Sequence, residues 1–178
     1  MRLEVKDLKE YANLIIYIAT ILMIISILTP VASHYIRGEQ SHVFWLWGLI
    51  SETNWLSSPV GWREDLTFYF NSNPVVVSIG LILTIVMFSF TIKNILIARY
   101  FRRDPEKEYI TPWYNIFYGI IPILLMISWV IFMEVIYSKI GFLGNYDFCD
   151  YFKPNFGVYG FIIGSSICTA GHALYKIL

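Results

Sequence analysis

The sequence of 178 residues is poor in the side chains that carry out chemistry. It contains two cysteines and three histidines, and charged residues make up 15 % of the chain. It has no P-loop, no dinucleotide-binding fingerprint, no CxxC pair and no nucleophile elbow. It has no basic tract either. These absences argue against an enzyme, against a bound cofactor and against a nucleic-acid partner.

Metal-binding patterns are equally sparse, and we expect no metal site. The histidines share no ligand spacing with the cysteines. The alternative is a site in the first outer loop, where His34 and His42 lie near Glu39 and Glu52.

The two cysteines are expected to be free thiols. Cys149 falls in the last loop, whereas Cys168 falls well inside the fourth apolar stretch. A disulfide needs Cα atoms within about 7 Å, which this separation in depth disfavours. The alternative is that Cys149 forms an intermolecular disulfide or binds a ligand.

Charge is missing altogether from four long stretches, which determine the fold class. They cover residues 11–33, 66–92, 109–133 and 154–175. Each holds at least about 20 residues, enough for a helix to cross roughly 30 Å of hydrocarbon. Because a bilayer offers no water to backbone groups, each span must be helical. The sequence predicts one all-α membrane domain over residues 1–178, a four-transmembrane-helix bundle in the lipid bilayer.

Turn and cap residues suggest the limits of these helices. Asn71-Ser72-Asn73-Pro74 is typical of a helix start, and Thr29-Pro30 of a helix end. We expect helices at about 11–33, 71–98, 110–137 and 154–176. The outer loops then cover about 34–70 and 138–153, and the inner loop about 99–109.

Basic residues predict the orientation in the cell membrane. Nine Lys and Arg residues fall on one side of the spans and four on the other. The positive-inside rule then places both termini and the short loop in the cytoplasm. The first span is longer than the 7–15 apolar residues of a signal peptide, so we expect it to be retained. The nine are Arg2, Lys6, Lys9, Lys93, Arg99, Arg102, Arg103, Lys107 and Lys176, and the four are Arg37, Arg63, Lys139 and Lys153.

The long first outer loop is rich in aromatic and β-branched residues. Trp45, Trp47, Gly48 and Leu49 stand at its centre. This composition favours a small extracellular β-layer over a structureless linker. The loop either packs as a lid on the bundle or forms a recognition surface for a partner or lipid.

The first and fourth spans differ in their small residues. The first is rich in Ile and Leu and almost free of small residues, which indicates that its outer surface faces lipid or is loosely packed. The fourth carries small residues on one helix face, at steps of three or four. Such a face lets two helix backbones approach closely, either inside the monomer or along a homodimer seam. Its members are Gly157, Gly160, Gly164, Cys168 and Gly171.

The third span contains two unusual residues. Pro122 removes a helical hydrogen bond and should kink the helix unless its neighbours compensate. Glu134 follows close to the outer end, and a carboxylate in a membrane is a candidate ligand or proton site. His172, near the inner end of the fourth span, is expected to be interfacial or bonded to a helix.

The layout resembles the claudin and peripheral-myelin-protein superfamily of four-span proteins. Claudins carry a Trp…Gly-Leu-Trp signature in the first outer loop, where this chain has Trp45-Leu46-Trp47-Gly48-Leu49-Ile50. Further weak similarities are Ser128-Trp129, Phe152-Lys153-Pro154 and Gly171-His172-Ala173-Leu174-Tyr175. The last Trp of the signature is Ile50 here and both loop cysteines are missing, so the family's disulfide does not carry over. The resemblance implies an outer β-layer on a left-handed bundle, with self-association or cell-surface contacts and no catalysis.

We therefore expect a non-enzymatic membrane protein that acts through protein contacts. It would be a claudin-like scaffold or an accessory subunit, with a homo-oligomer or a membrane-protein partner. The alternative is a small transporter component or sensor of an apolar or weakly acidic ligand. In that case Pro122, Glu134 and His172 would mark a mobile helix and its polar contacts.

Overall fold

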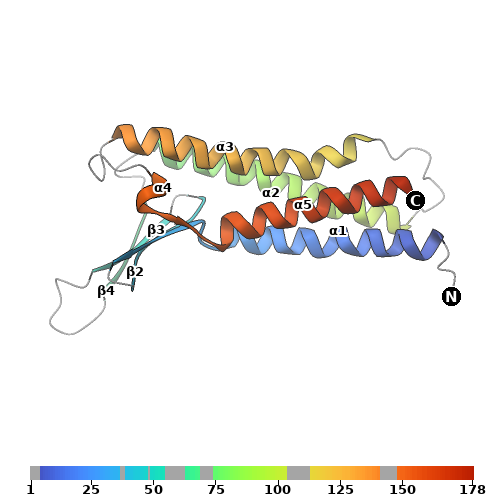
Figure 1. Cartoon of the computed structure of the whole chain (residues 1–178), viewed down its shortest axis with the longest axis horizontal. Helices are drawn as coiled ribbons and strands as arrows, with labels where there is room; N and C mark the ends of the chain where they lie inside the picture. The colour runs from blue at the N-terminus through green and yellow to red at the C-terminus, as the bar shows by residue number, and fades with distance from the viewer. Residues whose placement is uncertain are drawn as a thin grey trace.

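The computed structural model describes residues 5–36, 39–47, 49–54, 63–68, 74–103, 113–140 and 148–178. In this part of the chain, four helices are long and apolar enough to cross a membrane. They lie side by side in one elongated bundle (Figure 1). The prediction of a four-helix membrane bundle with a small β-layer is confirmed. The helices are α1 (Val5–Leu28), α2 (Pro74–Arg103), α3 (Phe117–Ile140), preceded by the 3-10 helix η3 (Trp113–Ile116), and α5 (Phe156–Ile177).

A sheet extends from one end of the bundle, opposite the end where α1 begins and α5 finishes (Figure 1). In the described residues it has five strands in the order β4-β3-β2-β1-β5, with antiparallel neighbours. The short helix α4 (Phe148–Tyr151) lies between this sheet and α3. The strands are β1 (Ala32–Ile36), β2 (Glu39–Phe44), β3 (Leu49–Asn54), β4 (Arg63–Phe68) and β5 (Lys153–Pro154).

The helix limits differ from the expected ones at several ends. The first helix runs over 5–28 instead of 11–33, because Pro30 stops it and residues 32–36 form a strand. The second begins at Pro74 and continues to Arg103, five residues beyond the expected end. The third reaches Ile140, and the fourth runs over 156–177. The uncharged residues mark the part of each helix that crosses the hydrocarbon layer. The helices themselves continue beyond it into the membrane interface.

The first and fourth spans pack closely against each other as an antiparallel pair, α1 with α5. Their proximity is set by the glycine face of α5. A Cβ built on Gly157 would lie 2.6 Å from the Pro30 carbonyl oxygen, and one on Gly164 would lie 3.0 Å from that of Ala19. The face is therefore buried inside the monomer's own bundle. All five residues of this face are buried: Gly157, Gly160, Gly164, Cys168 and Gly171.

The outer surface of α1 is exposed as expected, but its other face carries small residues and is closely packed. Ala12, Ala19 and Ser26 are fully or almost fully buried on one face of α1 at seven-residue intervals. The carbonyl oxygens of Ala12 and Ala19 lie within about 3.4 Å of Cβ positions built on Gly171 and Gly164. Three small residues two turns apart are enough to bring the backbones together. Close packing of α1 is therefore indicated by the seven-residue spacing of its small residues and not by their number.

Backbone hydrogen bonds connect this helix pair directly to the sheet. The Asn155 amide donates to the Val31 carbonyl at 2.8 Å, and the Gly157 amide donates to the Pro30 carbonyl at 2.9 Å. The Val31 amide in turn donates to the Phe44 carbonyl at 2.8 Å. Asn155 also caps α5, since its side chain accepts from the Phe156 amide at 3.0 Å. The sheet is thus held in position by the chain segments that leave α1 and enter α5.

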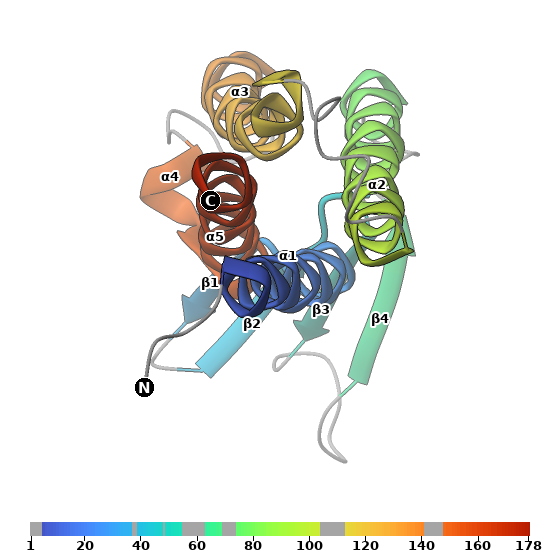
Figure 2. The same cartoon turned by 90° about the vertical axis from the view of Figure 1, so that its right-hand side faces the viewer.

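Seen along the bundle, α5 lies between α1 and α3, and α2 lies on the far side of α1 from α5 (Figure 2). Pro122 is buried inside α3, which is continuous from Phe117 to Ile140. The described part of α2 exposes a broad apolar face, as expected for a surface in contact with lipid. That face includes Leu81, Ile82, Ile85, Phe88, Ile92 and Leu96.

Strand register aligns two rows of residues across the sheet. One row joins Ala32, Phe44, Ile50 and Thr67. The next row joins His34, His42, Glu52 and Asp65. The β1–β2 pairing shifts by one residue immediately after His34. Residues two apart on a strand share a face, so both rows belong to the same face of the sheet.

We predict that Gly164→Leu destabilises the monomer, because its side chain meets the backbone of Ala19 and Met23. The expected loss is about 1–3 kcal/mol, typical of overpacking. Thermal unfolding of the detergent-solubilised chain measures it. Ile163→Leu is the matched control, because Ile163 is 52 % exposed on the opposite side of α5. Equal midpoints for the two variants would contradict the close α1–α5 contact.

Candidate functional site at the sheet end of the bundle

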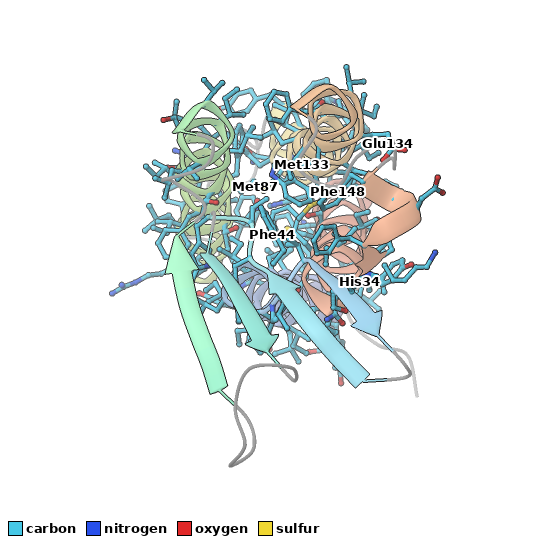
Figure 3. The ribbon with its side chains drawn as sticks, turned by 90° about the vertical axis from the view of Figure 1, so that its left-hand side faces the viewer. His34, Phe44, Met87, Met133, Glu134 and Phe148 are labelled. Carbon is cyan, nitrogen blue, oxygen red and sulfur yellow. The ribbon has the colours of Figure 1, made fainter. Side chains whose placement is uncertain are left out.

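The segment that ends β2 is anchored in the bundle by Phe44. This ring is 1 % exposed and lies about 6 Å, centroid to centroid, from the rings of Trp129, Phe148 and Phe152. Figure 3 shows Phe44 between the strands and the helix ends, with Met87, Met133 and Phe148 nearby. Phe148 and Phe152 stack at 4.9 Å. Aromatic packing therefore joins the sheet, α3 and α4.

Leu46 makes a second anchor two residues further on. Its side chain is 1 % exposed, and a Cβ built on Gly80 of α2 would lie 2.6 Å from its carbonyl oxygen. Only a glycine at position 80 lets the loop backbone come so close to the helix. Trp45 and Trp47 alternate with the anchors and are half-buried, with ring centroids 6.4 Å apart. The four residues thus form a fixed segment that presents two indole rings.

The predicted contact residues fall in this segment only in part. Trp45 and Trp47 are brought together, Leu49 begins β3, and Gly48 lies outside the described residues. Sequence reasoning missed Phe44 and Leu46, which are the buried members. Strand periodicity could have indicated Phe44 but not Leu46, because β2 ends at Phe44 and Leu46 lies in the turn that follows.

Glu134 has a definite structural partner. Its Oε2 accepts a hydrogen bond from the Cys149 backbone amide at 2.8 Å. The carboxylate thereby satisfies a free amide in the first turn of α4, which ties this short helix to α3 (Figure 3). Glu134 therefore holds the segment that carries Phe148 and Phe152.

The Cys149 thiol next to Glu134 is poorly suited to reaction. Burial raises its pKa to about 11, and the hydrogen bond and negative charge of Glu134 act in the same direction. The thiolate is the reactive form of cysteine, so this environment disfavours disulfide formation. Cys168 is fully buried in α5, with the Thr20 hydroxyl within hydrogen-bonding reach. Both cysteines are free in the structure.

The opposite half of the bundle interior is polar. Asn94 of α2 donates through Nδ2 to the Tyr118 carbonyl at 3.1 Å, which points its Oδ1 toward His172 of α5. Nε2 of His172 lies 2.8 Å from that oxygen, so this nitrogen carries the proton and donates. His172 is 3 % exposed and Asn94 is fully buried. These two bonds connect α2 with α3 and α5 across the interior.

Three buried polar atoms of the bundle interior have no hydrogen-bond partner in the described part of the chain. They are Oδ1 of Asn13, Oγ of Ser165 and Nδ1 of His172. Asn13 and His172 lie at the same level, because the carbonyl of Ala12 packs on Gly171. Stacked rings of Phe101 and Tyr175, with centroids 4.1 Å apart, close the bundle beyond them. The interior therefore contains hydrogen-bonding capacity that the protein itself does not use.

No three His, Cys, Asp or Glu side chains gather into a metal site among those that the structure describes. The polar interior has no carboxylate among its described buried residues. The arrangement offers no nucleophile next to a base in these residues.

We predict that Cys149 reacts slowly with iodoacetamide. A pKa of about 11 in place of 9.0 leaves roughly 100-fold less thiolate at pH 8. The rate should rise about tenfold per pH unit up to pH 11. Glu134→Gln keeps an acceptor for the Cys149 amide but removes the charge, so it should accelerate alkylation. Mass spectrometry locates the label, and a wild-type rate equal to that of a free cysteine would refute the expectation.

Asn94→Leu should destabilise the bundle by about 1–2 kcal/mol, because it leaves His172 without an acceptor in the interior. Thermal unfolding in detergent measures the loss. Thr91→Val serves as the control, since its hydroxyl bonds only to Met87 of the same helix. A loss no greater than that of the control would show that the cross-helix bond contributes little.

Comparison with known proteins gave no matching family model, no similar curated protein and no similar solved structure.

Proposed function

We propose that the chain is a non-enzymatic multi-pass membrane protein that acts through protein contacts at its sheet end. The observation that carries this proposal is the pair Trp45 and Trp47, half-buried between the anchors Phe44 and Leu46. Tryptophan is enriched among the residues that dominate binding energy at interfaces. A segment fixed before binding also loses little conformational entropy when a partner docks.

The glycine face of α5 favours the sheet end over the helices as the contact surface. This face is occupied by α1 of the same chain, with Gly160, Gly164 and Gly171 against its backbone or side chains. A homodimer through that face would require the monomer to open. Self-association or binding to a membrane-protein partner is therefore proposed to use the tryptophan segment.

We further propose that the sheet end faces outward and that both termini are cytoplasmic, in the cell membrane. Positive charge near the opposite end of the bundle supports this orientation. There Lys9, Lys93 and Lys176 lie about 6 Å from the ring centroids of Tyr175, Tyr118 and Trp113, respectively. Lysine and aromatic side chains of this kind are typical of the membrane interface.

A claudin-like scaffold or an accessory subunit of a membrane complex is the form of this function that we propose. The sheet at one end of a four-helix bundle supports the resemblance in layout. Two differences weaken this resemblance. Ile50 stands where the signature has its last Trp, and both loop cysteines are missing. In this chain the burial of Phe44 and Leu46 would fix the loop in the absence of a disulfide.

A transporter component or sensor remains the second candidate, favoured by the unused hydrogen-bonding atoms of the polar interior. Nδ1 of His172 accepts hydrogen bonds, as a weakly acidic ligand would require. Glu134 is engaged with α4 and is not part of this interior. Ligand binding that is lost in Ser165→Ala but retained in Trp45→Ala would favour this function.

Replacing both tryptophans, Trp45→Ala with Trp47→Ala, should abolish association without unfolding the bundle. Each removes a half-buried ring and leaves both anchors in place. Native mass measurement after gentle extraction from the membrane would show loss of the complex, whether its second component is another copy or a different protein. Trp113→Ala is the matched control, because Trp113 is 64 % exposed at the opposite end. Full association by the double variant would remove the main support for this function.

A further inference from the structure

Asn13 of α1 and His172 of α5 lie at the same level and on the same side of the contact between these helices. The carbonyl oxygen of Ala12 lies 3.4 Å from a Cβ position built on Gly171, so these two residues face each other. The next residue of an α-helix is turned by about 100° around the helix axis. Because α1 and α5 are antiparallel, this turn carries Asn13 and His172 toward the same side. That side is the bundle interior, since both side chains are buried and His172 meets Asn94 of α2 there.

The two side chains present atoms of the same kind to this interior. Oδ1 of Asn13 is a hydrogen-bond acceptor, and Nδ1 of His172 is an acceptor because Nε2 carries the ring proton and donates to Asn94. Both acceptors are buried without a hydrogen-bond partner in the described part of the chain. Two acceptors cannot bond to each other, so a molecule that satisfies both must supply the hydrogens. An unpaired acceptor is costly inside a membrane protein, because no bulk water reaches it.

The buried hydroxyl groups of the interior do not supply these hydrogens. Thr20 of α1 and Thr91 of α2 donate to carbonyl oxygens of their own helices, at 2.5 and 2.8 Å. The hydroxyl of Ser165 is unpaired, but it lies two turns from His172 on α5, roughly 10 Å along the helix axis. The described side chains thus leave Asn13 and His172 in need of a donor.

The interior also determines the charge of a ligand. No Asp, Glu, Lys or Arg is among the buried residues that the structure describes. An ion bound in the interior would therefore lack a counter-charge in surroundings of low dielectric constant. An uncharged ligand avoids this cost.

We propose that Asn13 and His172 bind a small uncharged molecule that donates two hydrogen bonds, one to each acceptor. Water is the smallest molecule of this kind, and a small amide or diol offers the same donors. The site shares no residue with the tryptophan segment, so its failure would leave the contact function untouched. It rests on the second candidate function, the transporter component or sensor, only for what the ligand is used for. Binding by a chain that neither transports nor senses a solute would keep the site and remove that function.

Nitrogen-15 NMR of the histidine rings tests this site in the full-length, untagged chain in detergent micelles. The chain has three histidines, so the ring signals that persist in both His34→Gln and His42→Gln belong to His172. We expect Nε2 to be protonated and Nδ1 to show the lower-frequency shift of a nitrogen that accepts a hydrogen bond. The shift of a free, unbonded ring nitrogen at Nδ1 would overturn the site.

Magnetisation transfer distinguishes the possible donors. Transfer from water protons to the His172 ring identifies water as the bound molecule. Loss of this transfer with formamide, which has two N–H donors, but not with N,N-dimethylformamide, which has none, shows that a solute takes the place of water. A transfer that neither compound changes leaves water as the ligand. Equal loss with both compounds would contradict recognition through donors.

Asn13→Leu tests whether the two side chains share one ligand. The variant removes one acceptor at similar volume, so we expect the water transfer to be lost and the Nδ1 shift to move toward the free value. Thr91→Val is the matched control and should keep the wild-type spectrum, because this hydroxyl bonds within α2. Unfolding midpoints verify folding, and the wild-type spectrum tests the site even if Asn13→Leu does not fold. An unchanged shift and transfer in folded Asn13→Leu would show that Asn13 takes no part.

Discussion

The backbone contact between α1 and α5 is the constraint on which the rest of this structure depends. Gly157, Gly164 and Gly171 allow it on one helix, and Ala12 and Ala19 allow it on the other. In a bilayer, apolar side chains gain nothing from leaving lipid for protein, so close packing has to supply the association energy. The same pair continues into β1 and β5, which are paired at Ala32 with Pro154 and Ser33 with Lys153. The position of the sheet on the bundle thus follows from how closely two helices approach.

The bundle interior is divided into two halves of different chemistry. Aromatic rings and methionines fill the half beneath the sheet, where Phe44, Trp129 and Phe148 meet. This half is mainly apolar, although it contains the buried Ser26 and Ser33, and the Glu134 carboxylate secures α4 at its edge. The other half holds Asn94 and His172, and hydrogen bonds there replace close packing as the link between helices. A protein contact at the sheet end would therefore be supported by the aromatic half of the interior, and ligand binding would involve the polar half.

The spans were predictable because the bilayer imposes a strong and simple condition on charge and length. Their exact ends were not, since Arg103 and Val5 lie in helices that continue past the uncharged residues. The burial of Leu46 could not be predicted from a strand pattern, because only Phe44 lies in β2 and Leu46 lies in the turn that follows. Strand register was beyond sequence reasoning altogether. His34, His42 and Glu52 become neighbours only once the pairing of β1, β2 and β3 is known.

A sheet at the end of a membrane bundle needs something to hold its strands to each other and to the helices. Burial of Phe44 and the backbone bond from Val31 to the Phe44 carbonyl secure β1 and β2. Neither reaches β3.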